Sequence, residues 1–227
     1  MEKTREPQEA YKLIPFEEQC QLLEGVVRPG FFREGLIAIR SSELLEKISD
    51  IKGDFTSDPL WFARTGFYLS RNIIPELGET SQRFHERLFE YLKEEKGVNA
   101  DRVLVVADHE GDDTIRHELI HDVLFSRPRD ERERLVHYIY RGVQKKFDKD
   151  LGYHMFRVGE IFYPGREMNG RLGAVYEFTC KFFARQWGNT GDKYERDRTE
   201  SAVYVRDNAP DGLKNMYEEM GFIWLSN

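Results

Sequence analysis

The spacing of apolar and polar positions along the chain predicts a protein made mainly of helices. In most segments apolar side chains recur every three or four residues, which places them on one face of a helix. The segments expected to be helical on this basis are 16–23, 41–48, 58–74, 80–96, 114–126, 130–148, 172–187 and 210–220. The run 153–158 fits a helix and a strand equally well.

A few short apolar runs predict strands instead. Residues 35–40 and 102–107 are rich in Ile, Val and Leu, and 200–206 fits a third short strand. We therefore expect an α+β fold, predominantly helical, with a small β-sheet preceding the helix at 114–126. Residues 12–227 would form a single domain after a flexible N-terminus, residues 1–11, and the apolar tail 222–225 would dock on the core.

The helix expected at 114–126 carries candidate metal chemistry, an H-E-x-x-H pattern at residues 117–121. His117 and His121 are four residues apart and project from one helix face, so their imidazoles can bind one tetrahedral zinc ion. Glu118 can reach a zinc-bound water and take its proton. The preceding strand, 102–107, is expected to present an edge that holds an extended peptide across the metal.

Composition narrows the possible partners and location. The chain has 227 residues, 40% of them hydrophobic, and a net charge of −7 with both signs interspersed, which argues against nucleic acid as a partner. No apolar run approaches the roughly 20 residues of a membrane span, so we expect no membrane association. The charged N-terminus does not resemble a secretory signal, and Cys20 and Cys180 are too few for a disulfide framework. These features favour a cytoplasmic location.

Residues 113–125 resemble the active-site helix of the zincin metallopeptidases. The metzincin branch would place Gly at 124 and His at 127, where this chain has Leu124 and Arg127. The resemblance therefore implies a gluzincin-like pattern, in which a glutamate from a later helix is the third zinc ligand. It also implies a zinc metallopeptidase that acts on a peptide or protein substrate, with Glu118 as the general base.

Glu177 is the best candidate for the third ligand. It is the one carboxylate between Glu167 and Asp192, and it lies in an apolar, aromatic helical segment. A buried carboxylate without a partner is costly, and zinc would remove that cost. Lys181, one turn further on, is a competing partner for Glu177.

His154 is both the alternative third ligand and a candidate catalytic residue. As a donor to the oxyanion that forms during peptide hydrolysis it competes with Tyr153 and Tyr163. Asp122, directly after the second histidine, could hydrogen-bond a ligand imidazole or remain a solvated surface acid.

Two other functions remain open on the sequence. The same residues could form a non-catalytic zinc-binding or sensor domain with a zincin-like fold, which would have no open coordination position. Alternatively, the motif could be coincidental in an interaction domain, and the purified protein would then contain no stoichiometric zinc.

Overall fold

A computed structural model describes residues 12–53, 65–159, 168–186 and 196–225. The fold is α+β, mostly helical, with one small mixed sheet. Contacts between residues divide the chain into two compact units. The sheet unit comprises Met1–Gln19 and Glu34–Ile115, and the helical unit comprises Cys20–Arg33 and Arg116–Asn227. A single domain over residues 12–227 stays a prediction, and the N-terminus, residues 1–11, lies outside the described residues.

The sheet has four strands in the order β1-β2-β4-β3. Their bounds are Lys12–Ile14 (β1), Leu36–Arg40 (β2), Gly66–Ser70 (β3) and Arg102–Val106 (β4). β2 and β4 are parallel, whereas β1 pairs antiparallel with β2 and β3 antiparallel with β4. The predicted strands at 35–40 and 102–107 are therefore confirmed, and the two lie side by side.

The expectation that the strand before the motif helix presents a free edge is wrong. Every residue of β4 is paired with β2 on one side and with β3 on the other. Its backbone groups are consequently already used, and a peptide cannot add to it by strand pairing. The edge strands of this sheet are β1 and β3.

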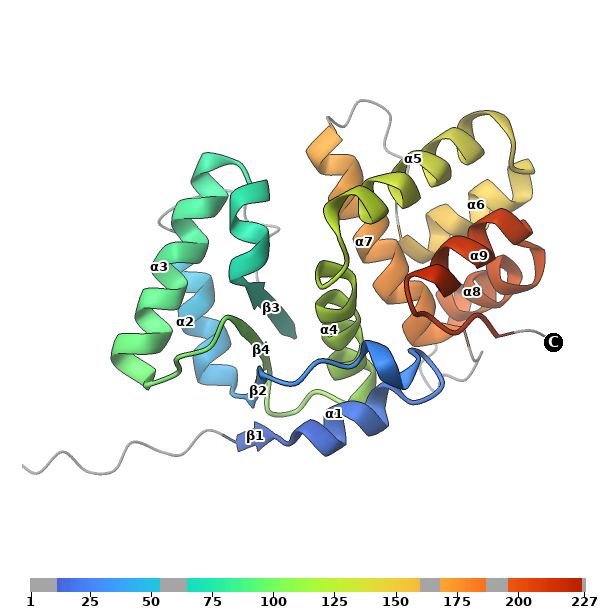
Figure 1. The fold of residues 1–227 in the computed structure, drawn as a ribbon. Coiled ribbons are helices and arrows are strands. Elements are labelled where there is room, and N and C mark those ends of the chain that lie inside the picture. The colour runs from blue at the N-terminus through green and yellow to red at the C-terminus, as the bar shows by residue number, and fades with distance from the viewer. Residues whose placement is uncertain (1–11, 54–64, 160–167, 187–195, 226–227) are drawn as a thin grey trace, which may run out of the picture. The chain divides into compact units, whose positions relative to one another are not determined.

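Two helices pack with the sheet to form the core of this unit (Figure 1). They are α2, Ser42–Gly53, and α3, Glu79–Lys96. The core side chains come from β2, β3, β4 and both helices, with Leu44, Leu88 and Val103 each at most 1% exposed. α3 ends as predicted at Gly97, whose φ of 68° is the left-handed conformation that glycine adopts most easily.

The helix predicted over 58–74 is wrong in its second half. Residues 66–70 form β3, and Arg71–Glu76 form a short 3₁₀ helix, η2. In β3, alternate residues Phe67 and Leu69 enter the core, which is the two-residue period of a strand. Pairing with β4 therefore outweighs the local helical pattern, and residues 58–64 lie outside the described part.

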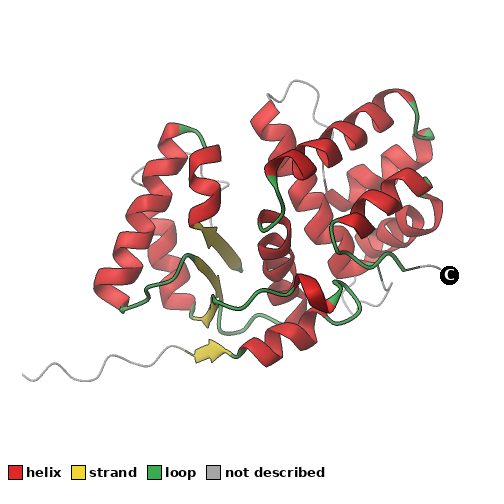
Figure 2. Cartoon of the chain, in the orientation of Figure 1, coloured by secondary structure: helices red, strands yellow, loops and turns green. Residues whose placement is uncertain are grey.

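The helical unit is built from six helices in its described residues, drawn in Figures 1 and 2. They are α4 Asp112–Phe125, which begins in the sheet unit, α5 Arg129–Lys145, α6 Lys149–Gly159, α7 Met168–Arg185, α8 Arg196–Asn208 and α9 Asp211–Glu219. A short helix, α1 (Phe16–Leu23), connects the units, and a 3₁₀ turn, η1 (Pro29–Phe31), follows it. α7 contacts α5, α6 and α8, so it lies at the centre of this unit.

The strand predicted at 200–206 is wrong, because these residues lie within α8. Thr199, Ala202 and Val205 are buried at a spacing of three residues, so the side chains follow a helical period. The ambiguous run 153–158 is likewise helical, with Leu151, Met155 and Val158 buried on one face of α6. In both segments, packing between helices outweighs the local preference of β-branched residues for strands.

The C-terminal tail docks on the helical unit, as predicted. Phe222 is fully buried and stacks on Phe183, with ring centroids 4.5 Å apart. The side chain of Gln186 donates to the carbonyl of Ile223 at 3.0 Å and accepts from the amide of Leu225 at 3.3 Å. The tail therefore fixes the end of α7 through both apolar packing and hydrogen bonds.

Candidate metal centre

Helix α4 presents its two motif histidines side by side. The rings of His117 and His121 have centroids 5.0 Å apart, and their side chains are 18% and 11% exposed. Apolar neighbours on α4 hold the helix in the unit, since Leu119, Ile120, Val123 and Leu124 are all at most 2% exposed. Phe125 stacks on the ring of His121 at 5.9 Å. The imidazoles are therefore fixed in a partly buried site.

Helix α7 brings Glu177 to both histidines. Its Oε1 lies 3.3 Å from Nε2 of His121, and its Oε2 lies 3.6 Å from Nε2 of His117. Lys181 also contacts this carboxylate, with Nζ 3.7 Å from Oε2. Glu177 thus contacts both the candidate zinc ligands His117 and His121 and its competing partner Lys181.

These separations match those of a common metal ligand set. Nitrogen and oxygen ligands lie about 2.0–2.1 Å from zinc, so tetrahedral ligand atoms are about 3.4 Å apart. The two contacts of Glu177 fall on either side of that value, each made by a different carboxylate oxygen, and ligand atoms of His117, His121 and Cys180 lie within 4.8 Å of one another. Its side chain is 45% exposed, so the carboxylate lies at the open side of the site. The residues present therefore fit a zinc ion.

Cys180, which the sequence analysis did not single out, lies in the same cluster. Ligand atoms of His117, His121 and Cys180 all lie within 4.8 Å of one another. Cys180 is fully buried, and burial raises the pKa of its thiol to about 11, while the adjacent His121 lowers that pKa. Its position three residues after Glu177 on the same helix was the signal that could have identified it.

Glu118 is the buried acid of the motif. It is 8% exposed, and burial raises its pKa to about 7, against an opposing effect of His121. A carboxyl group with that pKa can both take up and release a proton near neutral pH. The raised pKa and the position beside a candidate metal ligand are properties that a general base would have.

The charges of His117, His121 and Glu177 affect one another's pKa values. Burial lowers the pKa of His117 to about 3, and the charge of His121 adds to this effect. Burial also lowers the pKa of His121, but its contacts with Cys180 and Glu177 outweigh burial and raise that pKa well above its usual value. Burial would raise the pKa of Glu177, yet the adjacent His121 lowers it overall. His121 is thus favoured in its charged form beside the ionised carboxylate of Glu177, whereas His117 is favoured in its neutral form.

A buried arginine supports the wall of the site. Arg132 of α5 is 3% exposed and donates through Nη1 to the hydroxyl of Tyr176 at 3.1 Å. Tyr176 precedes Glu177 on α7, and its ring packs edge-on against Phe125 at 5.2 Å. Helices α4, α5 and α7 are consequently linked directly beside the histidine pair.

The structure does not bring His154 into this cluster. Its ring on α6 shares a 3.1 Å hydrogen bond with the hydroxyl of Ser201 and stacks on Tyr204 at 4.0 Å. Tyr153 beside it is 57% exposed, and Tyr163 lies outside the described residues. Asp122 is buried on α4, directly after His121. The catalytic role assigned to His154 stays a prediction that these contacts do not support.

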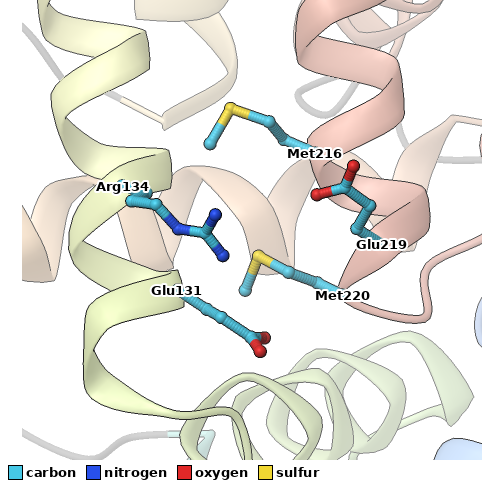
Figure 3. Close-up of a pocket in the computed structure, with 5 residues that line it drawn as sticks. All are labelled: Glu131, Arg134, Met216, Glu219 and Met220. Atoms are coloured by element: carbon cyan, nitrogen blue, oxygen red, sulfur yellow. The ribbon is translucent and has the colours of Figure 1, made fainter.

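A small hollow in the helical unit lies at a different place (Figure 3). It has a volume of about 70 Å³ and is lined by Glu131 and Arg134 of α5 and by Met216, Glu219 and Met220 in and just after α9. None of the histidine cluster lines it. The hollow therefore adds nothing to the metal chemistry.

Comparisons with protein-family models, with curated proteins and with solved structures found no match to this chain. Evidence on function therefore comes from the H-E-x-x-H motif and from the contacts that Glu177 and Cys180 make with its two histidines.

Proposed function

We propose that the protein is a zinc-dependent hydrolase, and that it is a peptidase of the gluzincin-like kind. The observation that carries the proposal is the contact of Glu177 with Nε2 of both motif histidines, at 3.3 and 3.6 Å. About sixty residues separate the motif from this glutamate in sequence, so the contact depends on the packing of α7 beside α4 and not on local spacing.

Each residue of the site has a distinct task in this proposal. His117, His121 and Glu177 would hold the ion. A zinc ion bound there would acidify a water molecule and polarise the scissile carbonyl group. Glu118 would take the proton of the attacking water and later donate it to the leaving amine, for which its raised pKa is suited.

The surroundings of the site are compatible with a polar peptide substrate. The carboxylate of Glu177 is 45% exposed, whereas Glu118 is 8% exposed, so the ligand side is open and the base is sheltered. None of the helices in the described residues has the length and apolar character of a membrane span. A cytoplasmic location and a peptide or protein substrate stay predictions.

A second function, a non-catalytic zinc-binding or sensor domain, is favoured by one observation. Cys180 offers a possible ligand atom within 4.8 Å of those of the two histidines, and Glu177 contacts both histidines as well. Four protein ligands are typical of structural zinc sites, whereas catalytic sites keep one position open. Turnover, or its absence at full zinc occupancy, separates the two functions.

The substitution Glu118→Gln tests the catalytic proposal. We expect the variant to retain zinc, because Glu118 is not a ligand, and to lose peptide hydrolysis by roughly 10²–10⁴-fold, because the general base is gone. Zinc content is measured by elemental analysis, and hydrolysis by mass spectrometry of a broad peptide library.

The control is Glu200→Gln, which makes the same chemical change at an exposed position of α8 in the same unit. It should leave both zinc content and hydrolysis as in the wild type. Hydrolysis by zinc-loaded Glu118→Gln at the wild-type rate would end the peptidase proposal.

A further inference from the structure

We infer that Cys180 binds the same metal ion as His117, His121 and Glu177, as the fourth protein ligand of the resting site. The inference rests on the proposed metal site and specifies how that site is closed when no substrate is present. Nothing in the H-E-x-x-H pattern or in the third-ligand argument requires a cysteine here.

The placement of the thiol is the first support. Ligand atoms of Cys180, His117 and His121 lie within 4.8 Å of one another. A sulfur about 2.3 Å from zinc lies about 3.6 Å from a nitrogen ligand. The ligand atoms would therefore have to move closer by only about 1 Å to surround one zinc ion, a shift that side-chain rotation can supply.

The arrangement on α7 is the second support. Glu177 and Cys180 are three residues apart and so lie on one face of this helix. Both reach the face of α4 that carries the histidines, which are themselves four residues apart. Helix α4 thus offers two candidate ligands and α7 another two, and four protein ligands are the number found in structural zinc sites.

The surroundings of Cys180 are the third support. The side chain is fully buried, and the neighbouring Thr179 and Phe178 are fully buried as well. Thr179 shares a hydrogen bond of 2.8 Å with the hydroxyl of Tyr217. This packing fixes the rotation of α7 about its axis, so the thiol is held toward the histidines and away from solvent.

Two consequences follow for the proposed hydrolase. A thiolate ligand favours zinc, cobalt(II) or cadmium over magnesium and manganese, which prefer oxygen ligands. A fourth protein ligand also occupies the position that an attacking water needs, so Cys180 would have to leave the ion before hydrolysis. Cys180 would thus keep the resting site inactive.

The test is the absorption spectrum of the protein loaded with cobalt(II) under reducing conditions. We expect wild-type protein to show visible ligand-field bands and a near-ultraviolet band from thiolate-to-cobalt charge transfer. Cys180→Ser should keep the visible bands, lose the charge-transfer band and bind cobalt at least about tenfold more weakly, since groups outside the ligand set alone change metal affinity 10–100-fold.

Cys20→Ser is the matched control, because it removes the other cysteine, which is partly exposed. It should keep both sets of bands. Wild-type protein that binds cobalt with visible bands and without a charge-transfer band would overturn the inference, and this outcome does not depend on whether Cys180→Ser folds.

The same samples separate this inference from the proposed function. A charge-transfer band in a protein that never hydrolyses peptides would support the thiolate ligand and reject the hydrolase. Hydrolysis without the band would reject the thiolate ligand and leave the hydrolase in place. No cobalt or zinc binding at all would reject both.

Discussion

At the scale of single residues, the two carboxyl groups of the candidate site, Glu118 and Glu177, have sharply different surroundings. Glu118 is buried and its pKa is raised to about 7, whereas the pKa of Glu177 is lowered beside the imidazole of His121. Two carboxylates with pKa values pushed apart suit two different roles, a proton carrier and a charged ligand. The assignment of roles thus follows from burial and from neighbouring charges.

His85 allows a test of burial outside the metal centre. It lies on α3 with 9% exposure, and its Nδ1–H donates to the carbonyl of Ser81 at 2.7 Å. Burial lowers the pKa of His85 below 6.5, and the charge of Lys52 adds to this effect. The unfolded chain therefore takes up this proton first as pH falls, and stability decreases below about pH 6.5 toward the folded pKa.

Replacing His85 by Gln should remove this contribution. Between about pH 8 and about pH 5, the free energy of unfolding of His85→Gln should fall less than that of the wild type, by about 1.4 kcal/mol for each unit of pKa depression. Urea unfolding at both pH values measures the difference. An equal fall in the free energy of unfolding of His85→Gln and of the wild type would contradict the prediction.

At the scale of elements, the sequence could predict helices with a strong apolar stripe and could not predict elements whose identity depends on distant partners. α3 and α5 were predicted because their own spacing of apolar residues is sufficient. β3 was missed because its strand conformation depends on pairing with β4. α8 was missed because Val203 and Val205 favour strands locally, while packing against α6 favours a helix.

The candidate site shows the same division. The histidine pair and Glu118 follow from spacing within one helix, and Glu177 follows from being the one acid in an apolar segment. The spacing of three residues from Glu177 places Cys180 on the same helix face, but its closeness to the histidines depends on how α4 and α7 pack, which no local pattern shows. The catalytic role predicted for His154 follows from its residue type alone, and its contacts are with Ser201 and Tyr204 of α8.

The packing of α6 against α7 makes a prediction at this scale. A Cβ added at Gly159 would lie 2.6 Å from the Cα of Phe178, so α6 and α7 would have to separate. Gly159→Ala should therefore lower the free energy of unfolding by about 1–3 kcal/mol. The midpoint of urea unfolding, at an unchanged slope, measures it.

Gly152→Ala is the control on the same helix. Its added Cβ would meet Cγ1 of Val143 at 3.8 Å, an ordinary contact, so the variant should be neutral or more stable by up to about 1 kcal/mol. Equal stability of the Gly159 and Gly152 variants would show that α6 and α7 are not as closely packed as described.

At the scale of the whole molecule, the chain passes between its two units three times, and α4 takes part in both. All four candidate ligands belong to the helical unit, on α4 and α7. Metal binding should therefore stabilise the helical unit directly, by about 2.7 kcal/mol at a free zinc concentration 100 times the dissociation constant.

Hydrogen exchange followed by mass spectrometry tests this prediction. Zinc should slow amide exchange in the helical-unit part of α4 and in α7, and leave exchange in α3 unchanged within error, because α3 supplies no ligand. Slowing confined to α3, or no slowing in α4 and α7 at saturating zinc, would contradict the assignment of the ligands.

The most direct test of the central claim is the zinc-to-protein ratio of purified wild type, His117→Ala, Glu177→Ala and His137→Ala, measured side by side after reconstitution. The account predicts one zinc ion per chain in the wild type and in His137→Ala, and much less in the two ligand variants. Wild-type protein without zinc, or zinc retained in His117→Ala, would contradict it.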